Sequence, residues 1–310
     1  MDQSGLISAA HKRDEPVSQK QRIIIQNNYG QKLVGVLHET GSVELVILCH
    51  GFRCSKESSI ITNLATVLEK EGISAFRFDF SGNGMCSHGL LFPYKGTAVM
   101  LLRLQEIKVE SEGSFQYGNY GGETDDLHAV VLHFSRLKRL ITAILGHSKG
   151  GDVVLLYASR FPDVHTVINV SGRFYMERGI EDRLGKDFME RIKKDGFIDV
   201  WHKTGKVAYR VTKESLMDRL NTDMHAASLS IKRDCRVLTI HGSMDEIVPI
   251  EDALEFSKII PNHKLHMVER ADHAYSSHQD DLASIVSDFI KTGLQQDKDV
   301  PNHVQLPKGR

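Results

Sequence analysis

The sequence predicts an α/β fold in which helices cover both faces of a mostly parallel central sheet. The first observation is that short apolar runs alternate with stretches whose apolar residues recur at helical spacing. The second is the run Leu45–His50 (LVILCH), which is apolar throughout, as expected of a strand buried on both faces. The third is composition, because 310 residues with 41 % apolar and 25 % charged side chains are ample for a large core.

The chain opens with two runs, Arg22–Ile25 and Leu33–His38, that predict antiparallel strands joined by a turn at Asn28 and Gly30. Further strands are expected at Leu45–His50, Ser74–Phe80, Leu140–Leu145, Thr166–Val170, Arg236–Ile240 and Lys264–Val268. Helices are expected at Ser58–Lys70, Glu123–Arg136, Gly150–Ser159, Ile250–Ile259 and Gln279–Lys291. This alternation predicts βαβ units, in which helices join neighbouring parallel strands.

Two segments interrupt the alternation of strands and helices. Residues 173–232 are too long for one crossover and rich in charged helical sequence, so we expect a small lid inserted between the sixth and seventh strands. Residues 85–109 stand where a short loop should be, and we treat them as an atypical loop insertion. Polar sequence predicts flexible tails at both ends. The expected plan is a core of 21–172 and 233–293 with tails at 1–20 and 294–310.

Charge and cysteine content limit the possible partners and compartments. Lys plus Arg number 39 and Asp plus Glu 40, so a net charge of −1 gives no field that would attract nucleic acid or an anionic membrane. Four cysteines cannot form a disulfide framework in a chain of 310 residues, which favours reduced thiols and a cytoplasmic address. Met1–Lys20 has no apolar core of a signal peptide, and no apolar run is long enough to cross a membrane.

A candidate nucleophile follows the strand predicted at Leu140–Leu145. The chain continues as GHSKG (146–150) and then as a predicted helix, which is the strand–turn–helix context of a G-x-S-x-G nucleophile elbow. A serine on so sharp a turn projects its hydroxyl into a cleft, and the turn needs residues without bulk at Gly146 and Gly150. The helix that begins after Ser148 directs its positive end toward negative charge that develops there.

A serine hydroxyl becomes a good nucleophile only when a base takes its proton and a carboxylate orients that base. Ser148, Asp245 and His273 occur in the order nucleophile, acid, base, each just past the carboxyl end of a predicted strand. Because these strand ends share one edge of a parallel sheet, the three side chains can meet there. Glu246 and Asp272 are rivals for the acid, although Asp272 adjoins His273 in sequence, which makes the usual geometry awkward.

Negative charge on a reacting carbonyl needs backbone N–H donors. Lys149, directly after the candidate nucleophile, supplies one amide, and its side chain is not required for this. Gly51 lets the chain bend after the third strand, so that the amide of Phe52 can supply the second. We interpret His50 as a histidine that orders this loop rather than as an acid or a base.

These motifs resemble those of the α/β hydrolases. In particular, the chain is similar to intracellular plant hydrolases of the serine-aminopeptidase-like group, which are related to bacterial cinnamoyl and feruloyl esterases. The resemblance covers most of residues 21–293. It rests on HGFRCSKES (50–58), FRFDFSGNG (76–84), GHSKGG (146–151), HGSMDEIVP (241–249) and ADHAYSSHQ (271–279).

The resemblance implies an α/β-hydrolase fold with Ser148, Asp245 and His273 as the triad and the amides of Phe52 and Lys149 as the oxyanion hole. The esterase relatives also carry a small lid between the sixth and seventh strands, which would contribute an acyl or aromatic pocket. One departure is residues 85–109, because the relatives run almost directly from the motif that ends here at Gly84 into a Glu-Ser-Glu-Gly type sequence. We treat the segment as a lineage-specific insertion or translated intron sequence.

The sequence therefore predicts a serine esterase that forms an acyl-enzyme with a small-molecule ester and needs no cofactor and no metal. Histidine and carboxylate clusters at zinc spacing do not occur in the sequence. Within the enzymes, a thioesterase, a lipase-like monoacylglycerol hydrolase and a peptidase stay open. A hydrolase-fold ligand receptor or a catalytically impaired relative is the alternative outside them. The serine in the elbow disfavours relatives that use an aspartate nucleophile.

Overall fold

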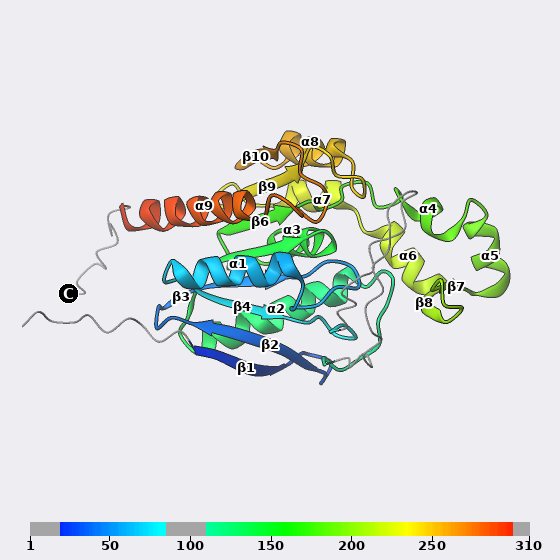
Figure 1. Cartoon of the computed structure of the whole chain (residues 1–310), viewed down its shortest axis with the longest axis horizontal. Coiled ribbons are helices and arrows are strands. Elements are labelled where there is room, and N and C mark those ends of the chain that lie inside the picture. Colours follow the sequence, from blue (N-terminus) through cyan, green and yellow to red (C-terminus); the bar gives the residue numbers. More distant parts are fainter. Residues whose placement is uncertain (1–18, 85–109, 300–310) are drawn as a thin grey trace, which may run out of the picture.

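The computed structural model describes residues 19–84 and 110–299, and an eight-stranded sheet forms its centre (Figure 1). The strands lie in the order β1-β2-β4-β3-β5-β6-β9-β10. Their bounds are β1 Gln19–Gln26, β2 Lys32–Glu39, β3 Glu44–Cys49, β4 Ser74–Phe78, β5 Leu140–His147, β6 Thr166–Val170, β9 Arg236–Gly242 and β10 His263–Val268. β2 runs antiparallel to both β1 and β4, and every other neighbouring pair in this sheet is parallel, so the predicted mostly parallel sheet is confirmed.

Helices cover both faces of the sheet, as the alternating pattern predicts. They are α1 Ser59–Lys70, α2 Tyr120–Arg136, α3 Lys149–Arg160, α8 Ile250–Ile259 and α9 Gln279–Asp299. Alternate residues of β3 point to opposite faces. Val46 and Leu48 pack with α1 and α9, whereas Leu45, Ile47 and Cys49 join the core formed with α2, α3 and α8. Both faces of β3 are thus buried, which explains its uninterrupted apolar run.

Between β6 and β9 the chain leaves the sheet and forms a separate group of elements. These are α4 Ile180–Leu184, α5 Phe188–Asp195, β7 Phe197–Trp201, β8 Val207–Thr212, α6 Lys213–Asn221 and α7 Met224–Ser230. The antiparallel pair β7–β8 and helices α4 and α5 project from one end of the sheet, at the right of Figure 1. In contrast, α7 returns to the sheet, where Met224 and Ala227 join the core beside α3. The role of residues 173–232 as a lid stays a prediction.

The regular structure extends further at both ends than the sequence pattern indicates. Residues 19 and 20, expected in a tail, are the first residues of β1, where Lys20 pairs with His38 of β2. Residues 294–299, also expected in a tail, are the last turns of α9. Leu294 follows Ile290 at helical spacing and packs against the same core, which explains the longer helix. No helix among residues 19–84 and 110–299 is both long and apolar enough to cross a lipid bilayer.

The predicted insertion at 85–109 lies outside the described residues, and the residues that flank it contact one another. A Cβ atom built on Gly84 would lie 2.9 Å from the amide nitrogen of Glu110, so the flanking residues meet directly. The ammonium group of Lys56 joins both sides, 2.7 Å from a carboxylate oxygen of Asp79 and 3.1 Å from one of Glu110. The hydroxyl of Ser111 donates to the Asp79 carbonyl at 2.8 Å. Contacts among the flanking residues thus fix this corner.

We therefore expect a variant in which Gly84 is joined directly to Glu110 to fold. Because the residues on either side already meet at this corner, a peptide bond between them needs little rearrangement. Loop length has a weak effect on folding free energy, so the free energy of unfolding should change by less than about 1 kcal/mol. Urea denaturation followed by circular dichroism measures this. Loss of the cooperative transition would show that the contacts of Lys56 and Ser111 do not suffice.

Candidate active site

The candidate nucleophile lies where the strand order of the sheet reverses. From β3 the chain first adds β4 on one side and then β5 on the other, so the loops that follow β3 and β5 separate at the carboxyl edge. In open α/β sheets this reversal opens a crevice that binds ligands. Ser148 follows β5 here with φ 56° and ψ −122°, a conformation that residues with a side chain rarely adopt. Its N–H donates to the Val170 carbonyl at 2.8 Å, and its carbonyl accepts from Gly151 at 2.8 Å.

The glycines on either side of Ser148 allow the close contacts that the sequence predicts for the elbow. A Cβ atom on Gly146 would lie 1.9 Å from the carbonyl oxygen of Gly150. One on Gly150 would lie 2.6 Å from the carbonyl oxygens of both Cys49 and His50. Because these obstacles are backbone atoms, side-chain rotation cannot relieve the clash. The two glycines bring the start of α3 against the end of β3.

A Gly150→Ala substitution is expected to lower the free energy of unfolding by about 3 kcal/mol, because its methyl group overpacks two carbonyl groups. Gly121→Ala is the matched control. A Cβ atom there has its nearest neighbours at 3.9 Å, and alanine favours a helix over glycine. Thermal denaturation of both variants tests this. Equal stability of the two proteins would contradict the packing described for the elbow.

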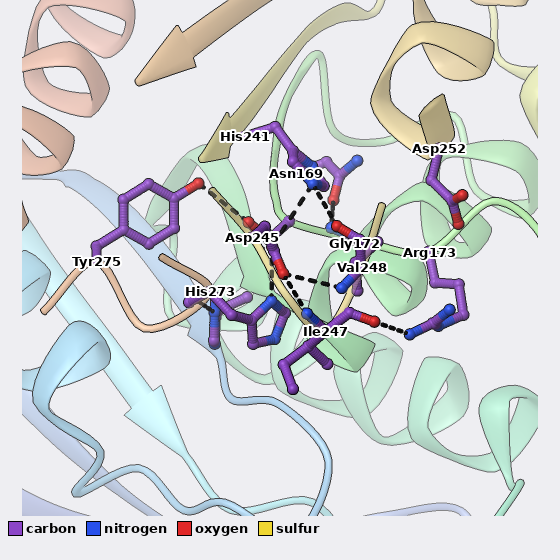
Figure 2. A network of polar contacts seen from close by, with 12 residues as sticks. Asn169, Gly172, Arg173, His241, Asp245, Ile247, Val248, Asp252, His273 and Tyr275 are labelled. Carbon is purple, nitrogen blue, oxygen red and sulfur yellow. Dashed lines mark hydrogen bonds and ion pairs between the residues drawn. The ribbon is translucent and has the colours of Figure 1, made fainter. Parts of the chain in front are cut away.

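The predicted acid and base are in direct contact (Figure 2). Nδ1 of His273 donates to one carboxylate oxygen of Asp245 at 2.7 Å. The other oxygen accepts the backbone N–H groups of Ile247 and Val248 at 2.9 and 2.8 Å. Although burial raises the pKa of Asp245, the hydrogen bond and charge of His273 and the Val248 amide together lower it to about 2. Asp245 is therefore ionised, and it fixes the Nδ1–H tautomer of His273.

The two rival carboxylates make different contacts. Asp272 accepts the backbone N–H of Ser276 at 2.7 Å, which caps the turn after His273, and Glu246 is exposed to solvent. The Asp245 carboxylate, in contrast, contacts the His273 ring (Figure 2). Of the three candidates, Asp245 is the one whose carboxylate can orient the base.

The base loop lies against the elbow. The ring of His147, the residue before Ser148, donates from Nε2 to the backbone carbonyl of His273 at 2.9 Å. The centroids of the two imidazole rings are 4.9 Å apart. Among the described residues the Ser148 hydroxyl has no hydrogen-bond partner, so its bond to Nε2 of His273 is not formed. In unliganded enzymes such catalytic hydrogen bonds are often long and shorten with substrate.

The predicted oxyanion donors are on the two loops that flank Ser148. The amide of Lys149 is the first of α3, and such amides have no partner within the helix. A Cβ atom on Gly51 would lie 3.1 Å from Cβ of Ser148, which brings the adjacent Phe52 amide to the same crevice. Among the described residues neither amide donates a hydrogen bond to the protein. Both are therefore available to an oxyanion.

His50 makes the contacts of a residue that orders this loop. Its Nδ1 donates to the Gly51 carbonyl at 2.8 Å, and its Nε2 accepts from the Phe80 amide at 3.2 Å. With one nitrogen donating and the other accepting, the ring is neutral, and burial lowers its pKa in agreement. His50 therefore connects the loop after β3 to the loop after β4.

The loop after β3 also contacts the inserted segment through an aromatic cluster. Phe52 makes edge-to-face contacts with Phe115, Tyr117 and Tyr209, with ring centroids 5.4, 5.6 and 5.7 Å apart. Arg53 donates to the carbonyl of Ala208 at 3.1 Å, and its guanidinium lies 4.6 Å from the Tyr209 ring. This aromatic cluster places the Tyr209 ring of β8 against the side chain of Phe52.

The side chain of Lys149 forms a buried ion pair that the sequence does not reveal. Its ammonium lies 2.7 Å from Glu123 in the first turn of α2, donates to the Gly118 carbonyl and faces the Tyr120 ring at 4.8 Å. Burial raises the pKa of Glu123 to about 7, against the opposing effect of Lys149. The pair joins α2 to the first turn of α3. No local sequence signal links two charges 26 residues apart.

Comparisons with known proteins agree with this architecture. Est1E of Butyrivibrio proteoclasticus, solved with ferulic acid bound, superposes with a TM-score of 0.69 at 23 % identity over 88 % of this chain and 99 % of its own. GrgF of Penicillium sp. sh18, described as an alpha/beta hydrolase, gives 0.67 at 17 % identity over 89 % and 99 % of the two chains. The chain has the α/β-hydrolase fold.

Three further findings concern this chain. The family model described as BAAT / Acyl-CoA thioester hydrolase C terminal matches residues 130–268, which include Ser148 and Asp245. The uncharacterized protein YDL057W of Saccharomyces cerevisiae is 26 % identical over 244 residues, 75 % of this chain and 69 % of its own. The esterase Pf2001 of Pyrococcus furiosus superposes with a TM-score of 0.62 at 19 % identity over 92 % and 95 % of the chains. Together these relatives support a hydrolase.

Proposed function

We propose that this α/β hydrolase is a serine carboxylesterase that cleaves small-molecule esters through an acyl-enzyme on Ser148. The observation that carries the proposal is the 2.7 Å bond from His273 to Asp245, on a loop bound to the elbow that holds a strained Ser148. Nucleophilic acyl transfer needs three groups: a serine held on a sharp turn, a histidine in a fixed tautomer, and an ionised carboxylate that orients the histidine.

In the proposed mechanism, Nε2 of His273 takes the proton of the Ser148 hydroxyl while its oxygen attacks the ester carbonyl. The amides of Phe52 and Lys149 stabilise the oxyanion that forms. The imidazolium then gives its proton to the leaving alcohol as the carbon–oxygen bond breaks, which leaves an acyl group on Ser148. Water, deprotonated by the same nitrogen, releases the acid and restores the serine. The steps use side chains and amides of this chain alone.

The aromatic cluster around the Phe52 side chain supports esters of aromatic acids as substrates. Phe52, Phe115 and Tyr209 make edge-to-face contacts with one another, and a surface of aromatic rings suits a flat aromatic ligand. Est1E, whose structure holds ferulic acid, provides a parallel among the structural neighbours. Methyl ferulate is therefore the first natural type of ester to assay.

A second candidate is hydrolysis of acyl-CoA thioesters, which the family model on residues 130–268 favours. The same triad and oxyanion donors would serve it, because a thioester differs from an ester in its leaving group. Assays of methyl ferulate and butyryl-CoA with the same preparation distinguish the two substrates. A kcat/KM higher for the thioester would favour this second candidate.

The cytoplasm is the compartment that we propose for the enzyme. Among the residues that the structure describes, Cys49 and Cys235 are buried thiols outside any disulfide bond, and thiols persist in a reducing compartment.

The test of the proposed function is hydrolysis of p-nitrophenyl butyrate by the full chain, with and without prior treatment by a fluorophosphonate. We expect turnover, and we expect one equivalent of the fluorophosphonate to abolish it, because the reagent forms a stable bond with an activated serine. Lack of turnover on esters and thioesters together with lack of inactivation would contradict the proposal and favour a ligand receptor.

A further inference from the structure

We infer that His147, the residue before the nucleophile, is a positioning residue that holds the base His273 in place; this inference rests on the proposed function. The Nε2 atom of His147 lies 2.9 Å from the backbone carbonyl oxygen of His273. The two residues are 126 positions apart, so this hydrogen bond ties the elbow directly to the base loop. We expect this hydrogen bond to fix the orientation of the His273 ring relative to Ser148.

The contact fixes the protonation of the His147 ring. A carbonyl oxygen can only accept, so Nε2 must carry the hydrogen, and the neutral ring has a bare Nδ1. Burial, together with the nearby charge of His273, lowers the pKa of His147 to about 3, so the ring stays neutral at neutral pH. A Cβ atom on Gly51 would lie 3.5 Å from Nδ1. The ring therefore fills the space between the elbow and the oxyanion loop.

The base loop needs such an anchor because its backbone is strained. Arg270 and Tyr275 on either side of His273 have φ angles of 61° and 52°, which side-chain-bearing residues rarely adopt. The buried hydroxyl of Tyr275 bonds to Ser171 at 3.0 Å, and Figure 2 shows Tyr275 beside the acid and the base. This bond holds the far side of the loop. Within the described part of the chain, His147 is the side chain that bonds the backbone of His273 itself.

The two bonds to His273 act on different parts of the residue. Asp245 holds the ring at Nδ1, whereas His147 holds the carbonyl group and hence the Cα–Cβ direction. With both in place, the position of Nε2 relative to Ser148 is defined from two sides. With the carbonyl released, the ring can turn about its bond to Asp245. A displacement of about 1 Å at a reacting group lowers the rate on the order of 10²-fold.

The experiment compares His147→Gln, His147→Asn and His147→Ala in the full chain. Glutamine is long enough to place an amide N–H where Nε2 lies, whereas asparagine carries the same amide on a shorter side chain that does not reach the carbonyl. The two substituted side chains thus carry the same amide group and differ only in length. Steady-state hydrolysis of p-nitrophenyl butyrate gives kcat and KM for each variant, and thermal denaturation reports whether each one folds.

We expect Asn and Ala to lower kcat by about 10- to 100-fold with KM changed less than about threefold, and Gln to stay within about threefold of wild type. A second readout needs no turnover. A hydrogen bond between a histidine and a buried carboxylate gives a far-downfield proton NMR signal, here from Nδ1–H of His273. The signal should persist in wild type and Gln, and broaden or vanish in Asn and Ala.

The two readouts separate failure of this inference from failure of the proposed function. Wild-type protein without esterase activity would contradict the function, while the NMR comparison would still test the anchor. The inference is overturned if Asn matches Gln in both rate and signal, or if a folded Gln variant loses activity as fully as Ala. If Asn and Ala fail to fold, the rate and the signal of the Gln variant alone decide.

Discussion

A Ser148→Ala variant should retain the fold and lose ester hydrolysis, with kcat lower by about 10⁴-fold or more. The expected size follows from serine hydrolases, in which loss of the nucleophile leaves only the acceleration that binding and the oxyanion hole provide. Alanine keeps the backbone contacts of the elbow, in which the N–H of residue 148 donates to Val170 and its carbonyl accepts from Gly151. The substitution therefore removes the hydroxyl and little else.

Ser159→Ala is the matched control, because Ser159 lies near the end of α3 and its hydroxyl donates to the Leu156 carbonyl at 2.7 Å. Initial rates with p-nitrophenyl butyrate and methyl ferulate, measured for both variants, give the comparison. Activity of Ser148→Ala within tenfold of wild type would show that another group carries the reaction.

An Asp245→Asn variant should lower kcat by about 10⁴-fold, and the surrounding amides explain why the change is so severe. The backbone N–H groups of Ile247 and Val248 donate to one carboxylate oxygen. In the variant they hold the amide oxygen of asparagine, so its NH₂ group faces Nδ1 of His273. The ring must then accept at Nδ1 and carry its hydrogen on Nε2. In that tautomer it cannot take the proton of Ser148.

Glu246→Gln tests the same change of charge on the neighbouring exposed carboxylate and should leave kcat within about twofold of wild type. Circular dichroism of Asp245→Asn is the control that shows whether the variant folds. Full activity in Asp245→Asn, with loss in Asp272→Asn, would assign the acid to the rival residue.

The contact between Asp245 and His273 could be anticipated because each residue lies just past the carboxyl end of a strand. Local patterns define those strands, and the topology of a parallel sheet brings their ends together. The glycines of the elbow follow the same logic, since the close approach of Gly146 and Gly150 is a property of one short segment. The predicted order of strands and helices is also confirmed, because local patterns define each of these elements.

The contacts that support the site could not be anticipated in this way. The bond from His147 to His273 depends on how two loops pack. The local sequence around His147, between a glycine and a serine, does not predict its hydrogen-bond partner. The buried pair of Lys149 and Glu123 likewise joins two helices. The sequence pattern places the end of α9 too early because polar side chains beyond Leu294 mask its helical spacing.

The most direct test of the central claim is to locate the site of covalent labelling. The protein is treated with a fluorophosphonate, digested, and its peptides are sequenced by mass spectrometry, with Ser148→Ala treated in parallel. The account predicts one phosphonate per chain, on Ser148, and no label on the variant. A label on any other residue, or an unlabelled wild-type protein that still hydrolyses esters, would contradict it.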